Sequence, residues 1–268
     1  MDGMSTIGIQ NTACFLFDLD GTVYLGDHLL PGAEELLAYL DETGTPYFFL
    51  TNNSSRSRED YAQKLAGFGL FADRERIITS GVATVIYLKD QKPSARIYLV
   101  GTPSLEGEFK ANGFQLVDEN PDFAVLGFDT TLTYNKLRKF SDFVAGGIPY
   151  IATHSDINCP TPTGFMPDIG AMMAMIESST GKKADLIIGK PHTPMVEVVV
   201  TLTGYAPDHL TMVGDRLYTD IALGQAGILT VLVLSGETEK ADLPDVPRQP
   251  DLMCQNLGEL LRILKWEK

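Results

Sequence analysis

The chain has 268 residues, 44% of them hydrophobic, which is enough for one large globular domain or two smaller ones. Its 21 basic and 35 acidic residues give a formal net charge of −14. An acidic surface repels phosphate backbones and anionic lipids, so the composition argues against a nucleic-acid or membrane partner. A small phosphorylated substrate stays open, because charge close to a site can oppose the net charge.

The cysteines indicate a reducing compartment. Cys14, Cys159 and Cys254 are odd in number, far apart and form no Cys-x-x-Cys pair. This pattern predicts free thiols in a cytoplasmic protein, with neither a disulfide framework nor a zinc site. The N-terminus has no basic stretch followed by an apolar core, and no apolar run is long enough to cross a bilayer. We therefore expect neither a signal peptide nor a membrane-spanning helix.

The first predicted strand carries the clearest functional signal. The apolar run 14–17 ends in Asp18 and Asp20, one residue apart, and then breaks at Gly21. The run is typical of a buried strand and the glycine of its exit turn. Carboxylates are costly inside a sheet, so both should face a ligand at its open end. In a strand this spacing puts two like charges on one side, and a divalent metal ion would relieve their repulsion.

Strand and helix patterns alternate along the rest of the chain. After Pro31 and Gly32, the apolar residues within 33–40 fall on one helix face, and Gly44 fits a C-cap. Further strands are predicted at 46–50, 96–100, 123–128, 149–152, 186–188, 210–213 and 229–234. Further helices are predicted at 57–66, 134–144, 170–178, 195–203 and 256–266. Alternation of this kind predicts βαβ units and a mostly parallel sheet, that is, an α/β fold.

Four of the predicted strands lead into a polar residue. These residues are Asp18, Thr51, Lys190 and Asp215, of which the last two each follow a glycine. The carboxyl ends of parallel strands share one edge of a sheet, and ligands bind in the crevice there. If these strands are neighbours, the four side chains converge on one point, which makes the combination far more specific than a lone Asp-x-Asp-Gly.

The ordered motifs resemble those of the haloacid dehalogenase superfamily over nearly the whole chain. They are Asp-Leu-Asp-Gly-Thr at 18–22, Leu-Thr-Asn at 50–52, Gly-Lys-Pro at 189–191 and Gly-Asp-Arg-Leu-Tyr-Thr-Asp at 214–220. The second motif and the long insert after it are similar to subfamily IIA, the NagD-like and p-nitrophenylphosphatase-like proteins. The resemblance implies a Rossmann-like doubly wound parallel-sheet core at residues 1–81 plus 184–268. It also implies an inserted α/β cap domain at residues 82–183.

The resemblance also implies roles for the acidic residues. Asp18 is expected to be the nucleophile that forms an aspartyl-phosphate. Asp20 is expected to protonate the leaving alcohol and then to activate the water that cleaves the intermediate. Mg²⁺ is the expected cofactor, held by the carboxylates of Asp18 and Asp215 and by the main-chain carbonyl of Asp20. Asp220 is expected to orient Lys190 or a metal-bound water.

Phosphate binding is assigned to the second and third motifs. The Thr51 hydroxyl and the Asn52 amide are expected to donate hydrogen bonds to phosphate oxygens, with Asn53 in the same group. Lys190 is expected to supply a positive charge to those oxygens or to Asp18. In the insert, His154, Asp156 and Asn158 follow a predicted strand, and either leaving-group recognition or an ordinary polar loop explains them. Met166, Met172, Met173 and Met175 are expected to pack in the core of the cap.

The function predicted from these motifs is Mg²⁺-dependent hydrolysis of small phosphate monoesters. Sugar phosphates, nucleoside monophosphates and p-nitrophenyl phosphate are all candidate substrates, and the resemblance allows a homodimer. A phosphotransferase or mutase of the same superfamily is an alternative, because no residue here distinguishes water from a substrate hydroxyl as acceptor. A non-enzymatic phospho-accepting signalling module is the other, since receiver domains also place Asp, Thr and Lys at strand ends. Receivers are, however, about half as long and lack a large insert.

Overall fold

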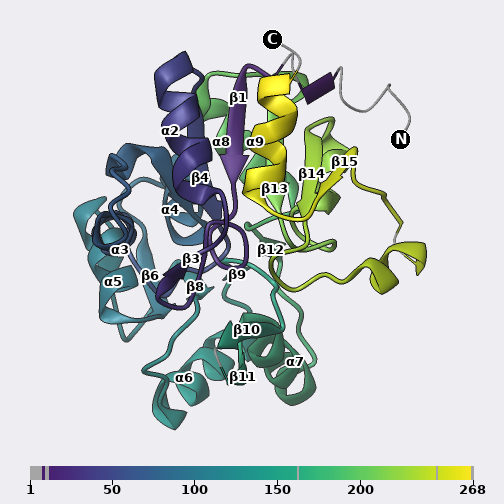
Figure 1. The fold of residues 1–268 in the computed structure, drawn as a ribbon. Coiled ribbons are helices and arrows are strands. Elements are labelled where there is room, and N and C mark those ends of the chain that lie inside the picture. The colour runs from purple at the N-terminus through teal and green to yellow at the C-terminus, as the bar shows by residue number, and fades with distance from the viewer. Residues whose placement is uncertain (1–7, 10–11, 162, 246, 267–268) are drawn as a thin grey trace. The chain divides into compact units, whose positions relative to one another are not determined.

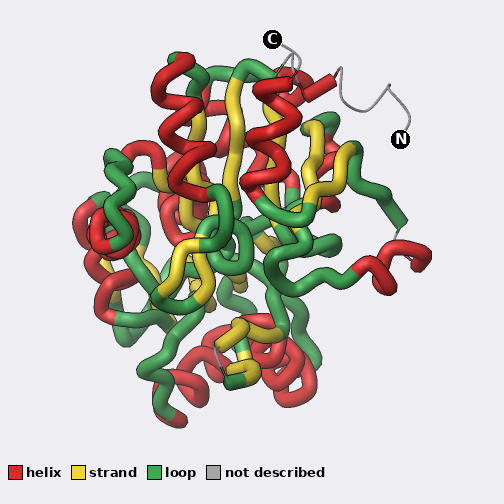
Figure 2. Tube along the Cα trace, viewed as in Figure 1, coloured by secondary structure: helices red, strands yellow, loops and turns green. Residues whose placement is uncertain are grey.

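The computed structural model describes residues 8–9, 12–161, 163–245 and 247–266. It divides into two compact units, each of them an α/β arrangement (Figures 1 and 2). Unit 1 takes in the described residues of 1–51, 64–78 and 199–268, and unit 2 takes in 52–63 and 79–198. Within the described part of the chain, no helix is long and apolar enough to cross a membrane.

Unit 1 is built on a six-stranded sheet with β1 near its middle. In order across the sheet the strands are β15 (Leu252–Cys254), β14 (Leu229–Val233), β13 (Leu210–Gly214), β1 (Cys14–Phe17), β4 (Tyr47–Thr51) and β5 (Ile77–Thr79). The pairs from β15 to β4 are parallel. Every residue of β1 is buried, as expected for a strand with both faces covered. The chain leaves β1 toward β4 on one side and later returns through β13 on the other, so the strand order reverses at β1.

Helices cover the unit 1 sheet and connect its strands. The helices α2 (Ala33–Thr43) and α9 (Leu257–Trp266) lie side by side in front of β1 in Figure 1, and the Gly258 N–H donates to the Pro31 carbonyl at 3.3 Å. A short hairpin, β2 (Tyr24–Leu25) and β3 (His28–Leu29), follows β1. The remaining elements are α3 (Arg58–Gly67) and α8 (Thr193–Thr203), which cross the unit boundaries, and the 3₁₀ turns η1 (Arg74–Arg76), η2 (Pro207–His209), η3 (Ile221–Ala226) and η4 (Lys240–Asp245).

Unit 2 has a parallel five-stranded sheet of its own. Its order is β12 (Leu186–Ile187), β9 (Tyr150–Ala152), β8 (Phe123–Leu126), β6 (Arg96–Val100) and β7 (Gln115–Leu116). Its helices are α4 (Ser80–Gln91), α5 (Pro103–Ala111), α6 (Tyr134–Ala145) and α7 (Ile169–Thr180). Residues of β6, β8 and β9 form one apolar core with α6 and α7, in which the rings of Phe140 and Tyr150 meet edge-on at 5.0 Å.

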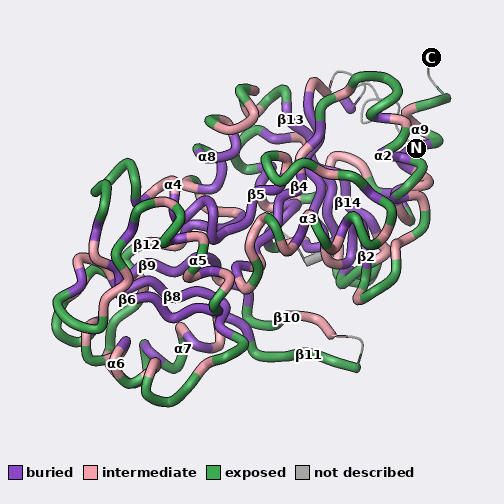
Figure 3. Tube along the Cα trace, turned by 90° about the vertical axis from the view of Figure 1, so that its left-hand side faces the viewer, coloured by how far each residue is buried: buried purple, intermediate pink, exposed green. Residues whose placement is uncertain are grey.

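An antiparallel hairpin joins β9 to α7 in unit 2. It consists of β10 (Asn158–Thr161) and β11 (Gly164–Pro167), and Figure 3 shows it exposed along most of its length. Met172 packs in the unit 2 core as predicted, and Met173 packs against it, but the prediction was wrong for Met166 and Met175, which are 37% and 45% exposed. Met166 lies on the hairpin, and Met175 lies at the edge of the face of α7 on which Ile169, Met172 and Ile176 are buried.

The predicted parallel α/β fold is confirmed, and the predicted strands and helices agree with the observed ones to within about two residues. The helices α4 and α5, the strands β5, β7 and β15, and the hairpins β2–β3 and β10–β11 were not predicted. The β10–β11 hairpin contains Pro160 and Pro167 and shows no regular alternation of apolar residues, so its sequence lacks the usual signal of a strand.

Candidate functional site

Three buried carboxylates meet in unit 1. Asp18, Asp215 and Asp220 each bring a carboxylate oxygen to within 4.8 Å of the other two, and their exposed fractions are 7%, 2% and 0%. Asp18 and Asp215 were predicted from the strand ends. Asp220 was expected to orient Lys190 or a metal-bound water, and its carboxylate lies in the same group. Three buried acids this close repel one another unless a cation or protons lie among them.

The sheet topology explains why Asp18 and Asp215 meet. Phe17 of β1 pairs with Val213 of β13, and the Asp18 N–H donates to the Val213 carbonyl at 2.9 Å. The two strands run parallel, so both acids leave the sheet at the same edge. The strand order reverses at β1, where loops that diverge from neighbouring strand ends leave room for a ligand.

A tight cradle fixes the Asp215 carboxylate. A Cβ atom on Gly236 would lie 2.0 Å from Asp215 Oδ2, and one on Gly21 would lie 2.3 Å from the same oxygen. The Glu237 N–H donates to Oδ2 at 2.7 Å. The Ser235 hydroxyl donates to the Gly21 carbonyl at 2.9 Å, which ties the two glycine loops together. One oxygen of Asp215 is therefore held by main chain that only small residues could bring so close.

The other Asp215 oxygen, Oδ1, is buried and has no hydrogen-bond partner among the described residues. Burial first, and then the neighbouring Asp220 carboxylate, raise the pKa of Asp215 well above its usual range. A buried acceptor without a partner is costly, and buried native polar groups rarely remain so. Carboxylate oxygens are the donors that hard divalent cations prefer, so this cluster fits a bound cation on the chemistry of its ligands.

The other predicted residues of unit 1 lie at the same sheet edge. Asp20 follows β1 by three positions, is partly exposed, and accepts a hydrogen bond from the Tyr24 hydroxyl at 3.4 Å. Thr51 is the last residue of β4, the strand beside β1, and is 3% exposed. The carboxylate of Asp20 is outside the three-acid cluster, which is compatible with the predicted use of its main-chain carbonyl.

A second polar group lies in unit 2 and joins Asn52, Asp156 and Lys190. Asn52 Oδ1 accepts the Lys190 N–H at 2.8 Å, while Asn52 Nδ2 donates to the Lys190 carbonyl at 3.1 Å and to Asp156 Oδ1 at 2.8 Å. Lys190 is only 1% exposed, and a cis peptide bond joins it to Pro191. The structure therefore brings together residues of the second and third motifs and a residue of the insert.

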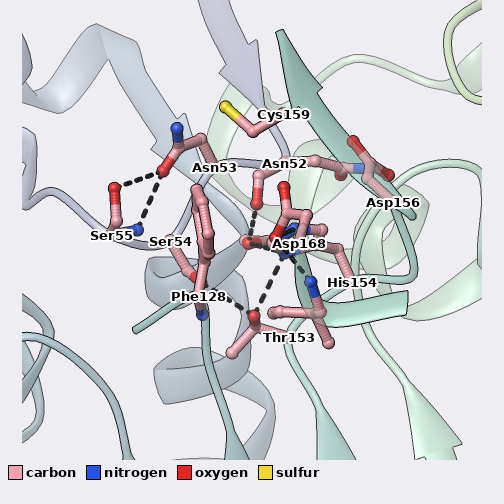
Figure 4. A network of polar contacts seen from close by, with 12 residues as sticks. Asn52, Asn53, Ser54, Ser55, Phe128, Thr153, His154, Asp156, Cys159 and Asp168 are labelled. Atoms are coloured by element: carbon pink, nitrogen blue, oxygen red, sulfur yellow. Dashed lines mark hydrogen bonds and ion pairs between the residues drawn. The ribbon is translucent and has the colours of Figure 1, made fainter. Parts of the chain in front are cut away.

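His154 belongs to the same unit and is completely buried. Figure 4 shows its polar neighbours. Its Nε2 lies 3.1 Å from Asp168 Oδ1, and its Nδ1 lies 3.2 Å from the Thr153 hydroxyl and 3.3 Å from the Ser80 hydroxyl. The Ser80 hydroxyl donates to the main-chain carbonyl of Asn52. Hydroxyl groups thus face one ring nitrogen of His154 and a carboxylate faces the other, so the ring is held on both sides.

The remaining sequence candidates lie at the edges of this group. Asn53 Oδ1 accepts from the Ser55 N–H at 2.9 Å and from its hydroxyl at 2.7 Å, a local turn contact. Asn158 is exposed at the start of β10. Sequence reasoning missed Asp168, Ser80 and the 235–237 loop. Only Asp168 had a usable signal, because an aspartate directly before an apolar helical run is a typical N-cap.

Comparison with known proteins gives consistent matches. Residues 15–115 match the haloacid dehalogenase-like hydrolase family, and residues 187–260 match a HAD-hydrolase-like family. The crystal structure of a 4-nitrophenylphosphatase from Thermotoga maritima is similar over 96% of this chain and 99% of its own, with 46% identity and a TM-score of 0.93. A structure described as a putative NagD protein is similar over 90% of this chain and 96% of its own, with 47% identity and a TM-score of 0.84. A 5′-nucleotidase of Bacillus subtilis is 35% identical over 246 residues, which cover 91% of this chain and 96% of the relative.

We predict that Gly236→Ala weakens binding of a divalent cation. The new methyl group would occupy the position of Asp215 Oδ2, so the carboxylate must rotate. Displacing a group that orients a ligand typically lowers metal affinity by roughly 10- to 100-fold. Calorimetric titration with Mg²⁺ measures the change. Gly107→Ala, where a Cβ meets no atom within 4 Å, serves as the control, and equal affinities in both variants would contradict the prediction.

We predict that Asp168→Ala lowers the free energy of unfolding by about 2–4 kcal/mol, because it removes the N-cap of α7 and leaves the buried His154 Nε2–H without an acceptor. Thr133→Ala removes only the N-cap of α6 and should cost about 1 kcal/mol. Urea unfolding of both variants isolates the contribution of the His154 pair. Equal losses would mean that the pair adds nothing.

Proposed function

We propose that this chain, a member of the haloacid dehalogenase-like hydrolases in the NagD-like subfamily IIA, is a Mg²⁺-dependent phosphatase of small phosphorylated metabolites. Phosphate monoester hydrolysis is the activity that its relatives share, and the sequence-based prediction of this enzyme class is confirmed. The observation that carries the metal dependence is the cluster of Asp18, Asp215 and Asp220 with its unpartnered, buried Asp215 oxygen.

The proposed roles of the acidic residues follow from the chemistry of carboxylates at the strand ends. Asp18 attacks the phosphorus atom in line, forms an aspartyl-phosphate and releases the alcohol, to which Asp20 gives a proton. Asp20 then takes a proton from the water that attacks the same phosphorus atom and releases phosphate. Asp18 and Asp215 would hold Mg²⁺ with the Asp20 carbonyl, and when bound the ion supplies positive charge that offsets repulsion between Asp18 and the phosphate. Thr51 and Lys190 bind the phosphate oxygens in this proposal.

The domain assignment is part of the same proposal. Residues 1–81 plus 184–268 would be the catalytic core, and residues 82–183 would be the cap that selects the leaving group. The presence of a separate parallel sheet in each compact unit supports two folded parts. No disulfide joins any of the three cysteines among the described residues, which supports the proposed cytoplasmic location. A homodimer stays a prediction from the resemblance.

The native chain should hydrolyse p-nitrophenyl phosphate in the presence of Mg²⁺, lose this activity in EDTA and regain it when Mg²⁺ returns. Asp18→Asn should lower kcat by roughly 10³-fold or more, because the nucleophile is removed. Asp27→Asn, at an exposed position, changes the charge equally and should keep native rates. A panel of sugar phosphates and nucleoside monophosphates, ranked by kcat/KM, then identifies the substrate class. Native kcat in Asp18→Asn would exclude the proposed nucleophile.

Turnover in water enriched in ¹⁸O separates hydrolysis from its alternatives. Attack of water on phosphorus should place the label in released phosphate and leave the Asp18 carboxylate unlabelled, as mass spectrometry can measure. A phosphotransferase or mutase would deliver the phosphoryl group to a hydroxyl acceptor with no label incorporated. A signalling module would retain phosphate on Asp18 without turnover.

A further inference from the structure

The side-chain amide of Asn52 has no hydrogen left for a phosphate ligand. An asparagine amide has two donor hydrogens and one carbonyl oxygen. The hydrogens go to the Lys190 carbonyl and to Asp156 Oδ1, and the oxygen accepts the Lys190 N–H. Asn52 itself is 4% exposed. Its amide thus forms hydrogen bonds with both the N–H and the C=O of Lys190, as a neighbouring strand would. We call this pair of bonds the bracket.

This bracket fixes the direction in which the Lys190 side chain leaves the main chain. Both peptide groups flanking the Lys190 Cα are bonded to one rigid amide, so their rotation is restricted. The main-chain carbonyl of Asn52 in turn accepts a hydrogen bond from the Ser80 hydroxyl. Placement of a group that touches the reacting atoms matters steeply, because an error of about 1 Å can lower a rate by roughly 100-fold.

Asp156 holds the far side of the bracket and is itself well anchored. Its main-chain carbonyl accepts the Gly170 N–H at 2.8 Å, and the neighbouring Ile157 carbonyl accepts the Asp168 N–H at 2.9 Å. Asp168 also binds His154, whose ring is locked on both nitrogens (Figure 4). The carboxylate that fixes the Asn52 amide therefore sits at the closed base of the β10–β11 hairpin.

We propose that Asn52 and Asp156 form a clamp that positions Lys190, and that the Asn52 side chain is not a phosphate ligand. This inference rests on the proposed function of Lys190 and revises the role expected for Asn52 from the motif. It also gives Asp156 a positioning role at this clamp in place of contact with the leaving group.

A charge-conserving exchange of the two side chains tests the clamp. Asn52→Asp keeps the acceptor for the Lys190 N–H but loses the donor to the Lys190 carbonyl, and it sets two carboxylates against each other. We expect kcat/KM to fall roughly 100-fold. Adding Asp156→Asn lets the new amide at position 156 donate to the carboxylate at position 52, which reverses the direction of the native hydrogen bond. The kcat/KM of the double variant should therefore be at least about tenfold higher than that of Asn52→Asp. Asn135→Asp, exposed on α6, adds the same charge and should match the native enzyme.

The two possible roles of the Asn52 side chain, clamp and phosphate ligand, predict opposite results for the double variant. If the amide bound phosphate, the carboxylate introduced at position 52 would repel phosphate in the single and the double variant alike, and no recovery would follow. Circular dichroism and the melting temperature must show that both variants are folded. A folded double variant with no gain over Asn52→Asp overturns the clamp.

A binding readout keeps this test independent of turnover. Inorganic phosphate, titrated by calorimetry in the presence of Mg²⁺, should bind the native chain most tightly, then the double variant, then Asn52→Asp. Absence of turnover by the native chain would refute the proposed function alone. Equal phosphate affinities in the double variant and Asn52→Asp would refute the clamp alone.

Discussion

Close burial of three acids is the constraint on which the rest of unit 1 depends. Asp18, Asp215 and Asp220 are nearly inaccessible, and each charge removed from water costs several kcal/mol unless it is compensated. The fold meets part of this cost with main-chain donors: the Glu237 N–H to Asp215 and the Arg216 N–H to Asp220 Oδ2 at 3.1 Å. The buried, unpartnered oxygen of Asp215 shows where compensation is incomplete. A cation bound among these acids would therefore stabilise the folded chain.

Unit 2 also buries polar side chains, and they are linked to one another by hydrogen bonds. Hydrogen bonds run from the Phe128 N–H to the Ser54 hydroxyl at 2.9 Å and join the Ser54 and Thr153 hydroxyls at 2.9 Å. The Thr153 hydroxyl also lies 3.2 Å from His154 Nδ1, and His154 Nε2 lies 3.1 Å from Asp168. Ser54, Thr153, His154 and Asp168 each have at least one hydrogen-bond partner within this network. Fully satisfied buried networks are rigid and specific, whereas partly satisfied ones are costly. This rigidity lets the base of an exposed hairpin serve as a fixed support for Asn52 and Lys190.

The sequence predicted those features that depend on local patterns. The apolar run before Asp18, the glycines beside Lys190 and Asp215, and the alternation of strands and helices are all readable without a structure. It did not predict partners that fold together from distant positions. Nothing near Asn52 indicates that its amide is bonded to Lys190, 138 positions away, or to Asp156, 104 positions away. Asn52 was expected to donate to phosphate because its side chain carries amide hydrogens, and in the structure those hydrogens go to Lys190 and Asp156.

Net charge and local charge act over different distances in this protein. The chain carries −14 overall, which would repel a phosphate ester approaching from solution. Screening at physiological salt limits that repulsion to about 8 Å, whereas a buried cation acts in a medium of much lower dielectric constant. Lys190 is 1% exposed, so in the proposed site its attraction for phosphate would be weakly screened, and its strength would depend on the distance at which the ammonium group is held. A phosphatase with a strongly negative net charge thus depends more on the rigid placement of a few positive charges than on their number. This is the physical reason for the proposed clamp, in which a buried carboxylate holds the amide that bonds the main chain of Lys190.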